Sequence, residues 1–212
     1  MLNYVEIARD CIYFMSRHYP FKCPVNIDET DVQQVGLANF SKSKGVTIYP
    51  YMYKRAYGYF GYNRIALLML KTLLHERTHS MKGPIAGSYG TGVPDKHYKL
   101  YSKFIEYEAN SIAIWSMGNI REEISSELRI PLEIVNKFIR LETGSHCMEY
   151  YHLIKSNESE IMKDINLRKC VDFKILRTLE SMDSILAKIN GIVMRPFNHS
   201  FCSQYEGGKA DG

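Results

Sequence analysis

Two histidines and a glutamate, His75, Glu76 and His79, stand close together in the chain and form the pattern H-E-x-x-H. Residues 63–82 carry apolar side chains at helical spacing, so the pattern falls inside a predicted helix. Residues four apart share one face of a helix, and both imidazoles can therefore reach one metal ion. Glu76 is placed to hold a zinc-bound water and to move its proton. The pattern predicts a catalytic zinc site; the alternative is a pair of surface histidines without a metal.

A third ligand is needed, because a catalytic zinc site has three protein ligands and one position open for water. Acidic residues follow on the next predicted helix, 98–117, in the run EYEAN at 106–110. We expect Glu106 to be the third ligand and Asn110, one turn later on the same face, to orient a ligating imidazole. Glu108 is the fallback ligand. The alternative for the whole run is an acidic helix face in contact with water.

The motif pair HERTH and EYEANSIAIWSM resembles the ImmA/IrrE family of zinc metallopeptidases, and the resemblance extends over about residues 1–140. The positions that carry it are His75, Glu76, His79, Glu106, Glu108, Ala109, Asn110, Ala113 and Met117. Two positions depart from the family pattern, which favours a small residue or glycine at Thr78 and a proline at Gly118. Residues after Thr143 share no such resemblance.

The resemblance implies a small sheet beside gluzincin-like helices, with zinc held by His75, His79 and Glu106. It also implies a protein substrate, namely a helix-turn-helix transcriptional repressor of a mobile element, a prophage or a stress-response system. The rival hypothesis is a non-catalytic regulator that uses the peptidase fold to bind a transcription factor or DNA.

The remaining sequence predicts an α+β fold, in which a small β-sheet packs on a helical bundle that carries the metal-binding helix. Further helices are expected over 2–19, 120–128, 132–140, 146–156 and 171–190, and strands over 35–40 and 46–51. The turn SKSKG joins the two strands, and the tyrosines that follow are expected at the rim of the sheet. We expect a metallopeptidase domain over 1–142, a helical extension over 143–195 and a flexible tail over 196–212.

The charge pattern disfavours direct DNA binding. The net charge is only +4, and the basic residues are scattered along the 212-residue chain. Residues 124–138 have the apolar spacing of a helix-turn-helix, but Arg129 stands where a turn glycine is common. A packed helical hairpin is therefore the preferred interpretation of this segment.

The cysteines and the N-terminus favour the cytoplasm. Five widely spaced cysteines with no C-x-x-C pair suit reduced thiols better than a disulfide framework or a thiolate zinc site. Glu6, Arg9 and Asp10 interrupt any apolar run of the kind a signal peptide needs. No run approaches the ~20 apolar residues that span a bilayer. We therefore expect no membrane association, whereas the sequence predicts no oligomeric state.

Overall fold

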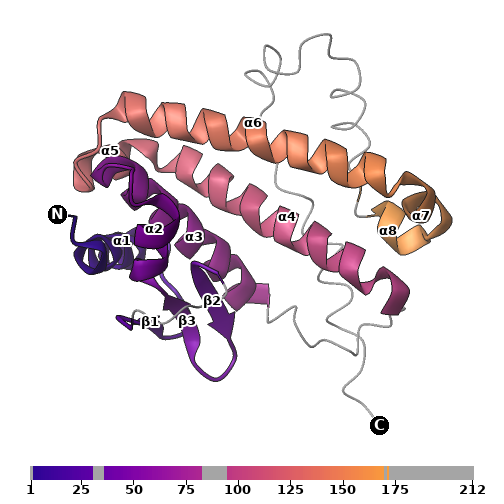
Figure 1. Ribbon diagram of the computed structural model, residues 1–212, viewed down its shortest axis with the longest axis horizontal. Helices are drawn as coiled ribbons and strands as arrows, with labels where there is room; N and C mark the ends of the chain where they lie inside the picture. Colours follow the sequence, from indigo (N-terminus) through magenta and orange to yellow (C-terminus); the bar gives the residue numbers. More distant parts are fainter. Residues whose placement is uncertain (1, 31–35, 83–94, 170, 172–212) are drawn as a thin grey trace. The chain divides into compact units, whose positions relative to one another are not determined.

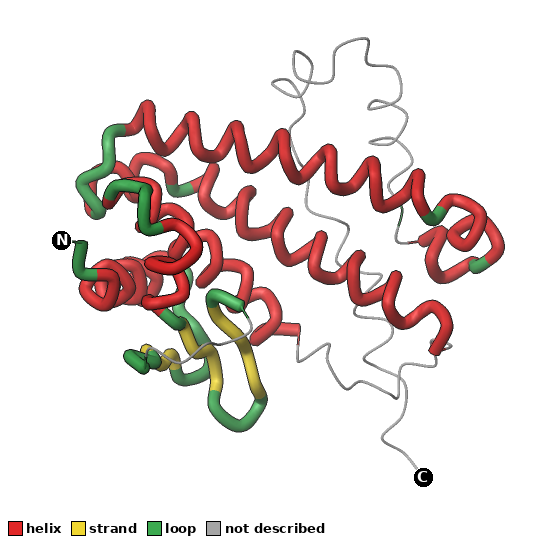
Figure 2. The backbone as a smooth tube through the Cα atoms, viewed as in Figure 1, coloured by secondary structure: helices red, strands yellow, loops and turns green. Residues whose placement is uncertain are grey.

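The computed structural model describes residues 2–30, 36–82, 95–169 and 171 (Figure 1). It has the predicted α+β fold, in which helices predominate and the strands form one small sheet. Figure 2 shows the short strands gathered in one place and helices over most of the other described residues. The chain divides into two compact units, the first made of Met1–Pro84 with Ile112–Ile139, the second of Ile85–Ser111 with Arg140–Gly212.

The sheet of the first unit has the order β1-β3-β2. Strands β2 (Ala38–Ser41) and β3 (Gly45–Ile48) form the predicted antiparallel hairpin, with Ser41 opposite Gly45. Strand β1 (Val25–Ile27) pairs parallel with β3 and was not predicted, because three residues are too few to show an alternating pattern. Gly45 has a φ of +78°, and a Cβ there would lie 2.2 Å from the carbonyl oxygen of Pro24. This close approach requires glycine.

One face of the sheet packs on helices α1 (Tyr4–His18) and α3 (Tyr62–Lys82). Val46 and Ile48 of β3 are fully buried in that core, whereas Thr47 between them points to the polar face. Helix α1 begins with Asn3, whose side chain accepts a hydrogen bond from the Glu6 amide, and it ends before Pro20 as predicted.

The tyrosine-rich segment after β3 forms helix α2 (Pro50–Tyr57). The prediction that these residues lie at the rim of a sheet was therefore wrong for Tyr51, Tyr53 and Tyr57. Aromatic residues favour strands by propensity, but Pro50 at the first helical position and the burial of Tyr53 against the core favour a helix here.

Helix α5 (Arg121–Glu127) and the start of α6 (Leu132–Ser156) form the predicted packed hairpin within the first unit. The amide of Ile130 donates to the carbonyl of Ser125 at 3.1 Å, which closes α5 with a Schellman-type turn. Arg129 takes the left-handed position of that turn, at a φ of +54°. Ile124, Leu128, Ile130 and Val135 are buried, as the apolar spacing predicts.

The second unit contains the first part of α4 (Asp95–Asn119), most of α6, and the short helices α7 (Glu158–Lys163) and α8 (Ile165–Lys169). Helix α6 runs without a break through the predicted boundary at 142/143, so the two helices expected there are one. The helix expected at 171–190 and the tail expected at 196–212 lie outside the described residues, apart from Val171. The core consists of Leu100, Tyr101, Phe104, Tyr107, Cys147, Tyr150, Ile154, Ile161, Leu167 and Val171.

Candidate metal centre

Helix α3 is held in place by its apolar face. Its buried side chains pack in the core of the first unit and are Ile65, Ala66, Leu67, Met69, Leu70, Leu73 and Leu74. The helix continues past Leu74 into polar residues, and His75 and His79 follow one turn apart. The core therefore fixes the base of the helix from which both imidazoles project.

The two imidazoles point at each other. Their Nε2 atoms are 2.9 Å apart, and the rings meet edge to face with centroids 4.6 Å apart. His79 is buried and His75 is half-buried. Two ring nitrogens at this distance can share a hydrogen when one of them is protonated, and they can also donate their lone pairs to one cation.

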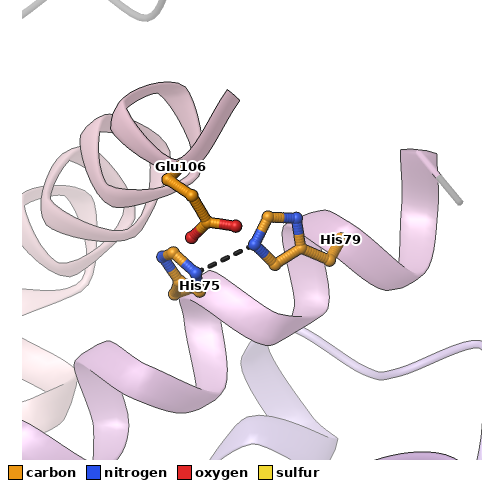
Figure 3. Close-up of side chains that lie close together, drawn as sticks. All are labelled: His75, His79 and Glu106. Carbon is orange, nitrogen blue, oxygen red and sulfur yellow. Dashed lines mark hydrogen bonds between the residues drawn. The ribbon is translucent and has the colours of Figure 1, made fainter. Parts of the chain in front are cut away.

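Glu106 of α4 joins the pair. One ligand atom each of His75, His79 and Glu106 lies within 4.8 Å of the other two, and Figure 3 shows the carboxylate directed toward the imidazoles. Bond lengths of about 2.0–2.2 Å around a tetrahedral zinc ion place its donor atoms roughly 3.3 Å apart. The group could hold a metal ion, and its donors are two imidazoles and one carboxylate.

Glu108 is not a member of this group. Its side chain is 3% exposed, whereas Glu106 is exposed. Residues two apart on a helix point about 200° away from each other, so only one of these two carboxylates can face a given site. The sequence offered both residues, and the structure brings Glu106 to the histidines.

Glu76 is buried, at 8% exposure, directly after the first histidine. It lies close enough to Tyr53 of α2 to affect that hydroxyl: burial raises the pKa of Tyr53, and the nearby Cys11 and Glu76 raise it further. Tyr53 itself is fully buried. Nothing in the sequence singled Tyr53 out from the neighbouring tyrosines, because its proximity to Glu76 depends on the packing of α2 against α3.

A hollow of about 300 Å³ in the second unit lies beside Glu106. Asn110, which the sequence predicts as a supporting residue, also lines it. The other walls come from α4 and α6, namely Ser102, Lys103, Tyr107, Glu149 and Leu153. The residues of α6 were missed because they lie far from the motif in the sequence.

The sequence also gave no sign of a buried group around a further histidine. His146 of α6 is buried, and its Nε2 lies 2.7 Å from the hydroxyl of Ser111 on α4. Its ring stacks on Tyr107, with centroids 3.8 Å apart and planes 10° from parallel. Sequence spacing gave His146 no role, because its partner is 35 residues away.

Comparisons with protein-family models, with curated proteins and with solved structures find no match for this chain. None of the helices that the structure describes combines the length and the apolar composition needed to cross a membrane. Among the described cysteines, Cys11, Cys23 and Cys147 are free thiols.

Proposed function

We propose that this protein is a cytoplasmic zinc-dependent endopeptidase of the ImmA/IrrE type. The observation that carries the proposal is the convergence of His75, His79 and Glu106, whose ligand atoms lie within 4.8 Å of one another. Two imidazoles and one carboxylate are the ligand set of several zinc peptidases. Such a set favours zinc over magnesium or calcium, which prefer oxygen ligands.

The chemistry depends on Glu76. Zinc bound here would lower the pKa of a water molecule and polarise the carbonyl of the scissile peptide bond. Glu76 takes a proton from the attacking water and later delivers it to the leaving amine nitrogen. Its burial beside His75 keeps bulk water away from this proton transfer. Asn110 shares a face of α4 with Glu106 and supports the site as a positioning residue.

The substrate we propose is a protein, specifically a helix-turn-helix transcriptional repressor. This part of the proposal rests on the motif resemblance in HERTH and EYEANSIAIWSM. Direct DNA binding by the chain itself is disfavoured, because residues 124–138 use their apolar side chains to pack α5 on α6.

The metal assignment is tested by a matched pair of variants on one helix. Purified wild type should contain about one zinc per chain, measured by elemental analysis after dialysis. Glu106→Gln should lose most of that zinc, whereas Glu108→Gln, two residues away, should retain it. Zinc loss in the Glu108 variant alone would exchange the roles of the two carboxylates, and no zinc in wild type after zinc addition would refute the metal centre.

The reaction is tested with Glu76→Gln, which keeps the size of the side chain and removes its basicity. We expect this variant to bind zinc as wild type does and to lose at least about a hundred-fold in cleavage rate. Purified helix-turn-helix repressors serve as substrates, with mass spectrometry of the fragments as the readout. Undiminished cleavage by Glu76→Gln would refute the assigned mechanism. Zinc binding without cleavage of any repressor by wild type would favour the non-catalytic regulator.

A further inference from the structure

A second site lies in the first unit. Helix α1, the start of α3 and the turn between α5 and α6 surround a hollow of about 620 Å³. This volume is within the range, roughly 300–1,000 Å³, of sites for small organic ligands. The metal-binding residues do not line it, and its charged and aromatic walls include Asp10, Tyr13, Arg17, Tyr62, Glu127 and Arg129.

One wall consists of charged side chains that pair with one another. Arg17 of α1 forms an ion pair with Glu127 of α5, and His18 lies 2.9 Å from the other oxygen of the same carboxylate. The guanidinium of Arg17 also sits over the ring of Tyr13, 5.0 Å from its centroid. These contacts join α1 to the end of α5, so this side of the hollow is held together without a ligand.

The other two charges, Asp10 and Arg129, have no hydrogen bond or ion pair with any residue that the structure describes. Both line the same hollow as Tyr62. Burial raises the pKa of the Tyr62 hydroxyl, Cys11 and Asp10 raise it further, and Arg129 lowers it. The same hydroxyl donates to the carbonyl of Leu128 at 3.4 Å, which leaves its oxygen able to accept. A carboxylate, a guanidinium and a phenol therefore line one hollow.

The backbone at Arg129 provides a separate observation. Its φ of +54° is the left-handed position that closes a helix, where glycine fits without strain and a side chain does not. The turn alone would be more stable with glycine. An arginine in this position, with no partner of its own among the described residues, points to a role for its guanidinium outside the turn.

We propose that this hollow binds a small zwitterion that carries both an ammonium and a carboxylate group, as free amino acids and short peptides do. The carboxylate pairs with Arg129, and the ammonium lies between Asp10 and the hydroxyl of Tyr62. An apolar side chain of the ligand packs on Phe14 and Leu128, the buried apolar residues of the lining. The opposite charges of Asp10 and Arg129 in the lining select this class over simple anions, which Asp10 repels, and over simple cations, which Arg129 repels.

The test uses the full chain and defined probes, namely L-leucine and leucyl-leucine, titrated by NMR and by calorimetry. We expect saturable binding, with shifts at Tyr62 and Arg129. N-acetylation or C-terminal amidation of the probe should each weaken binding by about ten-fold or more, because each removes one charged contact. Tight binding of one probe alone distinguishes an amino-acid site from a short-peptide site.

Arg129→Gly separates the two roles of this residue. It relieves the left-handed backbone, so the melting temperature should rise, while affinity for the probe should fall by about ten-fold or more. Asp10→Asn should weaken binding to a similar extent, and Arg121→Gln, an exposed position on α5, is the matched control. Equal binding by Arg129→Gly and wild type, equal binding of blocked probes, or no binding at millimolar concentrations would each overturn the proposal. None of these outcomes depends on the metal centre.

Discussion

The pair of His75 and His79 on α3 and the pair of His146 and Ser111 in the second unit each bring an imidazole Nε2 within hydrogen-bond distance of a neighbour, at 2.9 and 2.7 Å. At the first pair two ring nitrogens meet, and a carboxylate oxygen lies nearby. At the second pair a nitrogen meets a hydroxyl, and the ring is covered by Tyr107. A carboxylate lies near this ring too, but on its other nitrogen, with Glu149 3.9 Å from Nδ1. Converging lone pairs suit a cation, whereas a nitrogen matched with a hydroxyl suits a packed core. The neighbours of a histidine thus distinguish a ligand from a structural residue.

The largest expected difference between the two pairs is in their effect on metal affinity. His79→Ala removes one of the three proposed ligands. We expect zinc affinity to fall by more than about a hundred-fold, which exceeds the effect of removing a residue that only contacts a ligand. His146→Ala should leave the zinc content at its wild-type level. Competition with a chromophoric chelator measures both affinities. A similar loss in the His146 variant would show that the two histidines do not have separate roles.

The next largest effect is on the free energy of unfolding. Here substitutions in the second pair, not in the first, should have the larger effect. His146→Ala removes a buried ring and leaves the hydroxyl of Ser111 without this contact, so the free energy of unfolding should fall by about 2–4 kcal/mol. Ser111→Ala keeps the ring and removes the hydroxyl, with its hydrogen bonds to His146 and to the carbonyl of Tyr107, and should lower the free energy of unfolding by about 1–2 kcal/mol. Urea denaturation of metal-free protein provides the measurement, with His152→Ala, an exposed histidine of the same helix, as control. If His146→Ala lowered the free energy of unfolding by less than His152→Ala does, a structural role for His146 would be contradicted.

The smallest effect concerns pH and the residue after His146. Burial raises the pKa of the Cys147 thiol from 9.0 to about 11. Between these two pH values the unfolded chain loses the thiol proton while the folded protein keeps it. The contribution of this thiol to the free energy of unfolding is therefore complete below pH 9 and disappears as pH rises toward 11. Stability should fall over this window by up to about 2 kcal/mol.

Cys147→Ala should reduce that slope of stability against pH. Cys23→Ala, at a half-buried cysteine of the first unit, should leave the slope at its wild-type value. Urea midpoints at pH 8, 9 and 10 compare the slopes, which are independent of the constant loss that any cavity causes. An unchanged slope in the Cys147 variant would show that this thiol ionises alike in the folded and unfolded chain.

The sequence predicted the helices that carry the candidate metal ligands better than the elements around them. Helices α3 and α4 have long periodic patterns, and their predicted limits of 63–82 and 98–117 lie within a few residues of the observed Tyr62–Lys82 and Asp95–Asn119. Strand β1 and helix α2 were missed. The first is too short to show a period, and the second contains aromatic residues whose local preference for strands is overridden by the burial of Tyr53.

The candidate site likewise has features that the local sequence predicts and features that depend on packing. A spacing of four residues on one helix is enough to pair His75 with His79, because helix geometry is local. Local spacing left the choice between Glu106 and Glu108 open, and only Glu106 belongs to the group that could hold a metal ion. Contacts between distant helices, such as that of His146 with Ser111, have no signature in local spacing at all.

Helix α4 runs without a break from Glu106, a candidate metal ligand, to the buried residues near its C-terminus. Ala113 and Met117 are buried in the core of the first unit, and Glu106 precedes Ala113 by about two turns. Inserting one residue between Asn110 and Ser111 would rotate Glu106 by about 100° around the helix axis, whereas inserting four would return it to within about 40° of its original face, shifted by roughly 6 Å. If Glu106 is a ligand, the direction of its side chain around the helix axis matters as much as its carboxylate. A change in the length of α4 at this point would then act as a ligand mutation without altering any ligand.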